Sequence, residues 1–221
     1  TSEDLVIKKQ RSLIEPAIEL NVQRLMPAAA LQLRGQHNML NALAALALVE
    51  SIDCSISRVL YGLREYKGEP HRVESIGKLN GVEYFDDSKG TNVGATVAAI
   101  SGLGMERKIV VILGGDGKGQ NFAPLLEVVN KFVRAVVFIG KDKDIIFDAL
   151  KSADIPKASV ESMAQAAFAA EEFSQTGDAV LLSPACSSLD MFDNYEHRGR
   201  EFRVQVAALF DRSTPNMTDG V

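Results

Sequence analysis

Three short polar stretches in this chain carry residue types that could bind a small anionic ligand. Each follows an apolar run, and the three read FDDSKGTN (residues 85–92), LGGDGKGQN (113–121) and LLSPACSSLD (181–190). They supply two lysines, Lys89 and Lys118, and several hydroxyl groups, of which those of Thr91 and Ser188 are candidates for the same pocket. A carboxylate that leaves water needs charge-assisted donors, so ammonium and hydroxyl groups around one cavity suit a ligand with more than one carboxylate.

Asp87 and Arg72 differ in kind from these four residues. A carboxylate at the end of a strand is a common partner for the hydroxyl pair of a ribose, and an arginine plane can lie against a purine or a sugar. Each of the two also has an ordinary interpretation, as a solvated turn acid and as a surface arginine.

The polar stretches have ordinary interpretations as well. Asp, Ser, Gly and Asn commonly form the turn that ends a strand. The glycines around Lys118 match neither GxGxxG nor the GxxxxGK(S/T) of a phosphate-binding loop, so they could form a flexible turn with a solvated lysine. The segment 183–188 could likewise cap the helix that follows it.

The elements that must position these stretches alternate between strand and helix. A hairpin is expected over residues 71–88, because Asn80-Gly81 suits the positive φ angles of a type I′ turn. After it the pattern predicts strands over 108–113, 135–140, 158–160 and 178–183, and helices over 93–103, 123–132, 143–152 and 163–173, with a last helix ending near Phe210. Apolar strands joined by helices are typical of a mostly parallel, Rossmann-like α/β sheet with helices on both faces. Ligands bind outside the carboxyl ends of such strands, so the three polar stretches should open on one edge.

A domain boundary is expected near Gly68. Two helical patterns, over 38–51 and 55–66, precede the polar segment YKGEPHR, which contains Gly68 and Pro70. Residues 1–34 have weak periodicity and predict only short strands or loops. We therefore expect a first unit over 1–68, a second over 69–213 and a tail over 214–221.

Composition narrows the class of partner. The chain has 221 residues, 46% of them hydrophobic, and a net charge of -5 without a basic block, which argues against nucleic-acid and membrane-surface binding. Cys54 and Cys186 form no CxxC motif or Cys/His cluster, so neither a disulfide scaffold nor a zinc site is expected. The longest apolar run is too short to cross a bilayer, and the first residues lack the organisation of a signal peptide. These features favour a cytoplasmic protein with small-molecule partners, which we expect to be a monomer.

Five stretches of the sequence carry a resemblance to a known family. They are GQHNMLNALAALAL, GEPHRVE, FDDSKGTN, LGGDGKG and LLSPACSSLDMFDNYEHRGREF. Their order and spacing resemble those of the Mur ligases over roughly residues 33–210, and most closely the members that add D-glutamate to UDP-N-acetylmuramoyl-L-alanine. The resemblance implies an ATP-dependent amide ligase of peptidoglycan synthesis, in which the amine of D-glutamate attacks an acyl phosphate. It also implies that the Rossmann-like domain is the carboxyl-terminal domain of the family, preceded here by the end of the central ATPase domain.

The same resemblance implies roles for residues on the nucleotide side. Asn38 and Asn41 are similar to the asparagines that the family places near adenine. Arg72 and Asp87 resemble its ribose-side pair.

Roles on the amino-acid side follow in the same way. Thr91 and Lys118 resemble residues that hold the α-carboxylate of D-glutamate, and Ser188 and Tyr195 resemble residues near its side-chain carboxylate. Lys89 belongs to the same pocket. The family position of Tyr195 can be phenylalanine, which implies a backbone or ring contact there.

The family's central domain supplies a phosphate-binding loop, magnesium ligands and a modified lysine, and no GxxxxGK(S/T) occurs in these 221 residues. We therefore expect ATP and Mg²⁺ as cofactors, magnesium ligands outside this chain, and no ligase activity from the chain alone. His71 and His197 are interpreted as structural or surface residues. Two alternatives stay open: a noncatalytic nucleotide-binding α/β domain, and a related ligase, similar to folylpolyglutamate synthase, with another amino-acid substrate.

Overall fold

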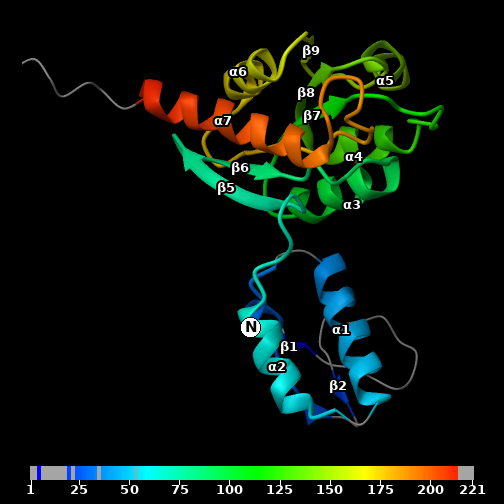
Figure 1. The fold of residues 1–221 in the computed structure, drawn as a ribbon, viewed down its shortest axis with the longest axis vertical. Helices are drawn as coiled ribbons and strands as arrows, with labels where there is room; N and C mark the ends of the chain where they lie inside the picture. The colour runs from blue at the N-terminus through cyan, green and yellow to red at the C-terminus, as the bar shows by residue number, and fades with distance from the viewer. Residues whose placement is uncertain (1–3, 6–18, 21–22, 34–35, 53, 214–221) are drawn as a thin grey trace, which may run out of the picture. The chain divides into compact units, whose positions relative to one another are not determined.

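The computed structural model describes residues 4–5, 19–20, 23–33, 36–52 and 54–213 (Figure 1). The chain divides into two compact units, Thr1–Gly68 and Glu69–Val221. The tail predicted over 214–221 lies outside the described residues, as do parts of the segment 1–34.

The first unit is built on two helices, α1 (Gln36–Glu50) and α2 (Ile56–Glu65), which pack against each other. Its small buried core consists of Met26, Leu31, Ala42 and Leu46. The helices follow two antiparallel pairs of two-residue strands and one 3-10 turn: β1 (Asp4–Leu5) with β4 (Met26–Pro27), β2 (Glu19–Leu20) with β3 (Gln23–Arg24), and η1 (Ala28–Ala30).

The second unit contains a six-stranded sheet in the order β5-β6-β10-β7-β8-β9. The strands are β5 (Glu74–Leu79), β6 (Val82–Asp86), β7 (Ile109–Gly114), β8 (Val133–Ile139), β9 (Lys157–Ser159) and β10 (Ala179–Leu182). Only the hairpin of β5 and β6 is antiparallel within this sheet, and the turn between them has positive φ at Asn80 (51°) and Gly81 (83°). The predicted hairpin and the mostly parallel sheet are therefore confirmed.

Helices cover both faces of this sheet (Figure 1). They are α3 (Val93–Gly104), α4 (Leu125–Phe132), α5 (Lys143–Ala149), α6 (Met163–Phe173) and α7 (Tyr195–Ser213). Side chains alternate along each central strand, so that Val111 packs in one core with α3, α4 and α5, and Val110 packs in the other with α6 and α7. Burial on both faces explains why these strands read as continuous apolar runs.

The order of the strands determines where the three polar stretches meet. β10 lies between β6 and β7 and is parallel to both, so the carboxyl ends of all three strands reach the same edge of the sheet. The loops that follow β6, β7 and β10 are the three polar stretches, and the predicted convergence is confirmed. No helix in the described part of the chain is long and apolar enough to span a membrane.

Candidate functional site

Backbone hydrogen bonds join the three polar stretches into a rim at their shared edge of the sheet, and Asp87 N donates to Leu182 O at 2.8 Å between the first and the third of them. Asp116 and Ser187 exchange a pair of such bonds, at 2.9 and 3.0 Å, which connects the β7 loop to the β10 loop. Gly114 N donates to Pro184 O at 2.9 Å in the same region. These backbone contacts fix part of the rim, and side chains add further connections between the loops.

The glycines of the β7 loop allow this close approach. Gly115 has a φ of 129°, and a Cβ atom there would lie 2.1 Å from the carbonyl oxygen of Ser187. Lys118 also adopts a left-handed conformation, with a φ of 49°, which costs roughly 1 kcal/mol or more in a residue other than glycine. Left-handed non-glycine residues concentrate at functional sites, and Lys118 was singled out in the sequence on chemical grounds.

The buried side chain of Arg198 in α7 connects the β6 loop to the β10 loop. The residue is 2% exposed, and its guanidinium donates to Ser88 O at 2.8 Å and to Cys186 O at 3.1 Å. Burial lowers the pKa of Arg198 to about 10, so the side chain still carries its charge at neutral pH. The sequence interpretation missed this residue, although it lies four positions before the buried Phe202 and therefore on the inward face of the helix.

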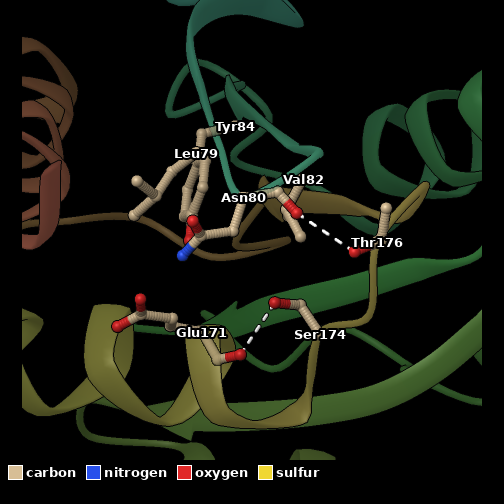
Figure 2. A pocket seen from close by; sticks show the side chains of 7 residues that line it. All are labelled: Leu79, Asn80, Val82, Tyr84, Glu171, Ser174 and Thr176. Carbon is tan, nitrogen blue, oxygen red and sulfur yellow. Dashed lines mark hydrogen bonds between the residues drawn. The ribbon is translucent and has the colours of Figure 1, made fainter. Parts of the chain in front are cut away.

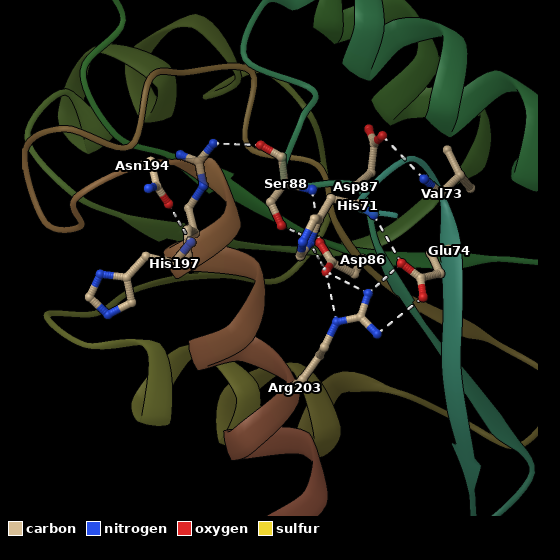
Figure 3. Close-up of polar contacts among 10 residues, drawn as sticks. His71, Val73, Glu74, Asp86, Asp87, Ser88, Asn194, His197 and Arg203 are labelled. Carbon is tan, nitrogen blue, oxygen red and sulfur yellow. Dashed lines mark hydrogen bonds and ion pairs between the residues drawn. The ribbon is translucent and has the colours of Figure 1, made fainter. Parts of the chain in front are cut away.

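A second arginine of α7 holds the beginning of the hairpin (Figure 3). Arg203 donates to Asp86 Oδ2 from two of its nitrogens, each at 3.1 Å, and to both carboxylate oxygens of Glu74. His71 Nδ1 lies 2.7 Å from the same Asp86 oxygen, and the backbone N of His71 donates to Glu74 Oε2 at 2.9 Å. The Asp86 side chain is fully buried. This network fixes residues on both sides of Arg72.

Asp87 points into the protein. Its Oδ2 accepts a 2.6 Å hydrogen bond from Ser183 Oγ. Its Oδ1 accepts a 3.3 Å bond from Val73 N (Figure 3). Only 6% of the residue is exposed, and this desolvation raises its pKa to about 7, against the opposing effects of the Ser183 hydrogen bond and the Arg72 charge. Arg72 itself is exposed.

Lys89 and Tyr195 come together at the start of α7. The Lys89 ammonium lies 5.4 Å from the centroid of the Tyr195 ring, a cation–π distance. The ring also packs edge-on against His71, with centroids 5.9 Å apart. A hydrogen bond with Glu196 raises the pKa of Tyr195, so the phenol keeps its proton at neutral pH.

The other three residues predicted on the amino-acid side lie one on each loop. Ser188 is 3% exposed, Thr91 is half-buried and Lys118 is exposed. Within the described residues the Lys118 ammonium has no ion-pair partner, and the Thr91 hydroxyl has no hydrogen-bond partner. Both groups are available to a ligand.

The alternative that residues 183–188 cap the last helix is wrong. α7 begins at Tyr195, and the Asn194 side chain accepts from His197 N at 2.7 Å, as a capping residue does. His197 lies near the surface, with Asp193 and Glu201 as ion-pair partners when it is protonated.

Asn38 and Asn41 belong to α1 of the first unit. They are three positions apart and therefore share one side of the helix. Asn38 is half-buried and Asn41 is exposed.

A small pocket lies at the opposite edge of the sheet from the three loops (Figure 2). It has a volume of about 160 Å³ and is lined by Leu79, Asn80, Val82, Tyr84, Glu171, Ser174 and Thr176. Pockets for nucleotide-sized ligands are larger, at roughly 300 Å³ or more. This pocket is therefore separate from the candidate site in position and too small for its expected ligands.

Within the described residues no group of three or more His, Cys, Asp or Glu side chains is arranged to hold a metal ion. Among the acidic residues of the rim, Asp86 accepts hydrogen bonds from two arginine nitrogens and lies beside His71 Nδ1. Asp190 accepts from Lys141 N through Oδ2, and its buried Oδ1 has no hydrogen-bond partner in the described residues.

Comparison with known proteins identifies the family. Residues 71–186 match the family described as "Mur ligase, glutamate ligase domain". The UDP-N-acetylmuramoylalanine–D-glutamate ligase of Albidiferax ferrireducens is 60% identical over 191 residues, which are 86% of this chain and 38% of that protein. The enzyme of the same name from Polaromonas sp. is 57% identical over 206 residues, or 93% of this chain and 35% of that protein. The chain thus spans less than half the length of these relatives.

Solved structures agree on the fold. The UDP-N-acetylmuramate–alanine ligase of Thermotoga maritima superposes with a TM-score of 0.63 at 23% identity, over 88% of this chain and 42% of that one. The folylpolyglutamate synthase of Mycobacterium tuberculosis, complexed with ADP, superposes with a TM-score of 0.58 at 17% identity, over 83% of this chain and 42% of that one. The matched domain covers more than half of the 221 residues, and the chain belongs to the Mur ligase family.

Proposed function

We propose that this chain is the carboxyl-terminal portion of an ATP-dependent ligase that adds D-glutamate to UDP-N-acetylmuramoyl-L-alanine in cytoplasmic peptidoglycan synthesis. The observation that carries the proposal is the rim of three loops at one edge of the sheet. In a chain with a net charge of -5, this rim presents Lys118 without an ion-pair partner in the described structure, together with Lys89. Two positive groups at the ligand-binding edge suit a dicarboxylate amino acid.

The proposed role of the second unit, residues 69–213, is to bind D-glutamate. Thr91 and Lys118 hold its α-carboxylate, Ser188 and Tyr195 contact its side-chain carboxylate, and Lys89 adds positive charge. The ring of Tyr195 offers a contact surface, since its hydroxyl is already paired with Glu196. Fixing both carboxylates orients the amine toward the acyl carbon, and such orientation lowers the barrier by replacing a random encounter with a fixed geometry.

The proposed role of the first unit, residues 1–68, is that of the end of the central ATP-binding domain. Asn38 and Asn41 face adenine, and Arg72 and Asp87 of the second unit face the ribose. Asp87 is 6% exposed and its oxygens already accept from Ser183 Oγ and Val73 N, so a contact with the ribose would use the remaining acceptor capacity of the carboxylate. ATP, as its Mg²⁺ complex, supplies the phosphoryl group that activates the substrate carboxylate. The magnesium ligands are proposed to lie outside this chain.

Two other readings are less well supported. A folylpolyglutamate synthase shares the fold at 17% identity, whereas the relatives above 50% identity are named D-glutamate ligases. A noncatalytic nucleotide-binding domain would have no need of the lysine and hydroxyl groups on the three loops. We further propose a cytoplasmic monomer that binds neither membranes nor nucleic acid.

A binding experiment on the 221-residue chain tests the proposed substrate. Isotope-labelled chain is titrated with D-glutamate, L-glutamate and meso-diaminopimelate, and amide chemical shifts are followed by nuclear magnetic resonance. We expect D-glutamate to shift the amides of Thr91, Lys118 and Ser188, with weaker or no effect from the other two compounds. Equal shifts with L-glutamate, or no shift in the three loops, would contradict the proposal.

A further inference from the structure

The side chain of Gln120 makes hydrogen bonds to all three loops. Its Oε1 accepts from Val93 N at 3.1 Å, where the β6 loop enters α3. Its Nε2 donates to Gly117 O at 3.1 Å in the β7 loop and to Ala185 O at 3.2 Å in the β10 loop. One carboxamide therefore connects three segments that are far apart in the sequence.

The chemistry of these partners determines how the carboxamide is oriented. Two carbonyl oxygens accept from the side chain and one backbone N–H donates to it, which matches the NH₂ and oxygen of an amide. Gly117 O also accepts from the backbone N of Gln120, so the side chain matters most for Ala185 O and Val93 N. The reversed orientation would place oxygen against oxygen at two contacts. The N–H of Val93 lies in the first turn of α3, where the helix itself provides no acceptor, so Gln120 also satisfies an otherwise unpaired donor.

The three contacted positions stand close to the proposed ligand-binding groups. Val93 follows Thr91 by two residues, Gly117 directly precedes Lys118, and Ala185 precedes Ser188 by three residues. The bonds of Gln120 thus fix the backbone on which each of these groups is carried.

The β7 loop needs such external contacts. Four of its residues, Gly114, Gly115, Lys118 and Gly119, have positive φ angles, a combination that costs conformational entropy when it is fixed. The two carboxylates of glutamate can reach only a limited range of separations, so their donors must lie within that range, and a misplacement of about 1 Å can cost roughly 100-fold in rate.

We propose that Gln120 is a positioning residue, which holds the three loops at the separations that allow Thr91, Lys118 and Ser188 to bind both carboxylates of one D-glutamate molecule. This inference rests on the proposed function. The three hydrogen bonds of the Gln120 side chain are all made to backbone atoms. Gln120 therefore acts on the ligand indirectly, through the positions of Thr91, Lys118 and Ser188.

Two variants of Gln120 distinguish the contribution of the amide oxygen from that of the amide NH₂ group. Gln120→Met keeps the length of the side chain and removes all three hydrogen bonds. Gln120→Glu keeps the acceptor for Val93 N and removes both donors. Gln175→Met is the matched control, because Gln175 is exposed and its side chain has no hydrogen-bond partner in the described residues.

The first measurement is hydrogen exchange of the Val93 amide in the 221-residue chain. We expect Gln120→Met to speed this exchange about tenfold or more, while the amide of the buried Val111 in β7 is unchanged. Gln120→Glu should retain the protection of Val93. An unchanged exchange rate in Gln120→Met would overturn the proposed connection.

The second measurement is the affinity for D-glutamate, from the same titration that tests the proposed function. Both Gln120 variants should bind about tenfold more weakly than the unchanged chain, and the Gln175→Met control should bind equally well. Normal affinity in Gln120→Met would overturn the positioning role. If the unchanged chain itself fails to bind D-glutamate, the proposed function is contradicted, and the hydrogen-exchange result still decides whether Gln120 holds the loops together.

Discussion

Replacing Lys118 by alanine tests whether this lysine binds the ligand or is only a solvent-exposed side chain on a turn. In the described structure its ammonium has no ion-pair partner, and its backbone N–H, which donates to Asp116 Oδ1 at 3.0 Å, remains in the variant. Alanine also tolerates the φ of 49° no worse than lysine does. We therefore expect the free energy of unfolding to change by less than about 0.5 kcal/mol.

The effect on D-glutamate binding should be much larger. Loss of a charge-assisted partner for a carboxylate costs roughly 2 to 4 kcal/mol, and the exposure of Lys118 favours the lower end of that range. A loss of about 2 kcal/mol corresponds to an affinity about 30-fold weaker. Lys118→Arg should restore little, because the guanidinium fork is larger and presents its donors differently from a compact ammonium.

The assay is titration of the chain with D-glutamate, combined with urea unfolding of the same samples. Lys151→Ala is the matched control, since Lys151 is an exposed lysine at the end of α5, away from the three loops. A Lys118→Ala variant with normal unfolding and normal D-glutamate affinity would refute the assignment of this residue to the site.

Three further predictions concern other parts of the account. Because burial raises the pKa of Asp87 from 3.8 to about 7, the carboxylate destabilises the folded chain increasingly as the pH rises from about 4 to 7, by at most ~4 kcal/mol. Asp87→Asn should therefore gain about 2 kcal/mol relative to the unchanged chain at pH 8 and nothing at pH 4, and identical pH profiles of urea unfolding would contradict this. Arg198→Met should lower the free energy of unfolding by roughly 2 to 3 kcal/mol, because the carbonyls of Ser88 and Cys186 lose their donor, and an unchanged unfolding curve would count against that role. The 221-residue chain alone should release no phosphate from ATP in the presence of D-glutamate and UDP-N-acetylmuramoyl-L-alanine, and measurable substrate-dependent release would show that its own residues suffice.

Much of the fold is visible in the sequence because the local signals and the tertiary structure agree. Apolar runs predict the buried strands, and the side chains of Asn92 and Ser162 cap α3 and α6 as their residue types indicate. The convergence of the three loops also follows from sequence, because parallel strands bring their carboxyl ends to one edge.

The residues that hold the loops in place, Arg198, Arg203 and Gln120, could not be predicted from the sequence. Arg198 reaches Ser88 across 110 positions, and Arg203 reaches Glu74 across 129, distances over which periodicity carries no information about partners. The pattern indicates that Arg198 faces inward, but the two carbonyl groups that it satisfies exist only once the loops have folded. The role of Gln120 could not be predicted either, because its neighbours in the sequence resemble an ordinary turn and two of its partners lie on other loops.

The central claim is that these loops select D-glutamate for an ATP-dependent ligation. The most direct measurement uses a hybrid ligase, in which this chain replaces the matching part of the Albidiferax ferrireducens enzyme to which it is 60% identical. Phosphate release is measured with ATP, Mg²⁺ and UDP-N-acetylmuramoyl-L-alanine while the amino acid is varied. We predict release with D-glutamate that falls about 30-fold in kcat/KM when Lys118 is replaced by alanine, and little release with L-glutamate or meso-diaminopimelate. A folded hybrid that turns over D-glutamate no faster than these two compounds would contradict the account.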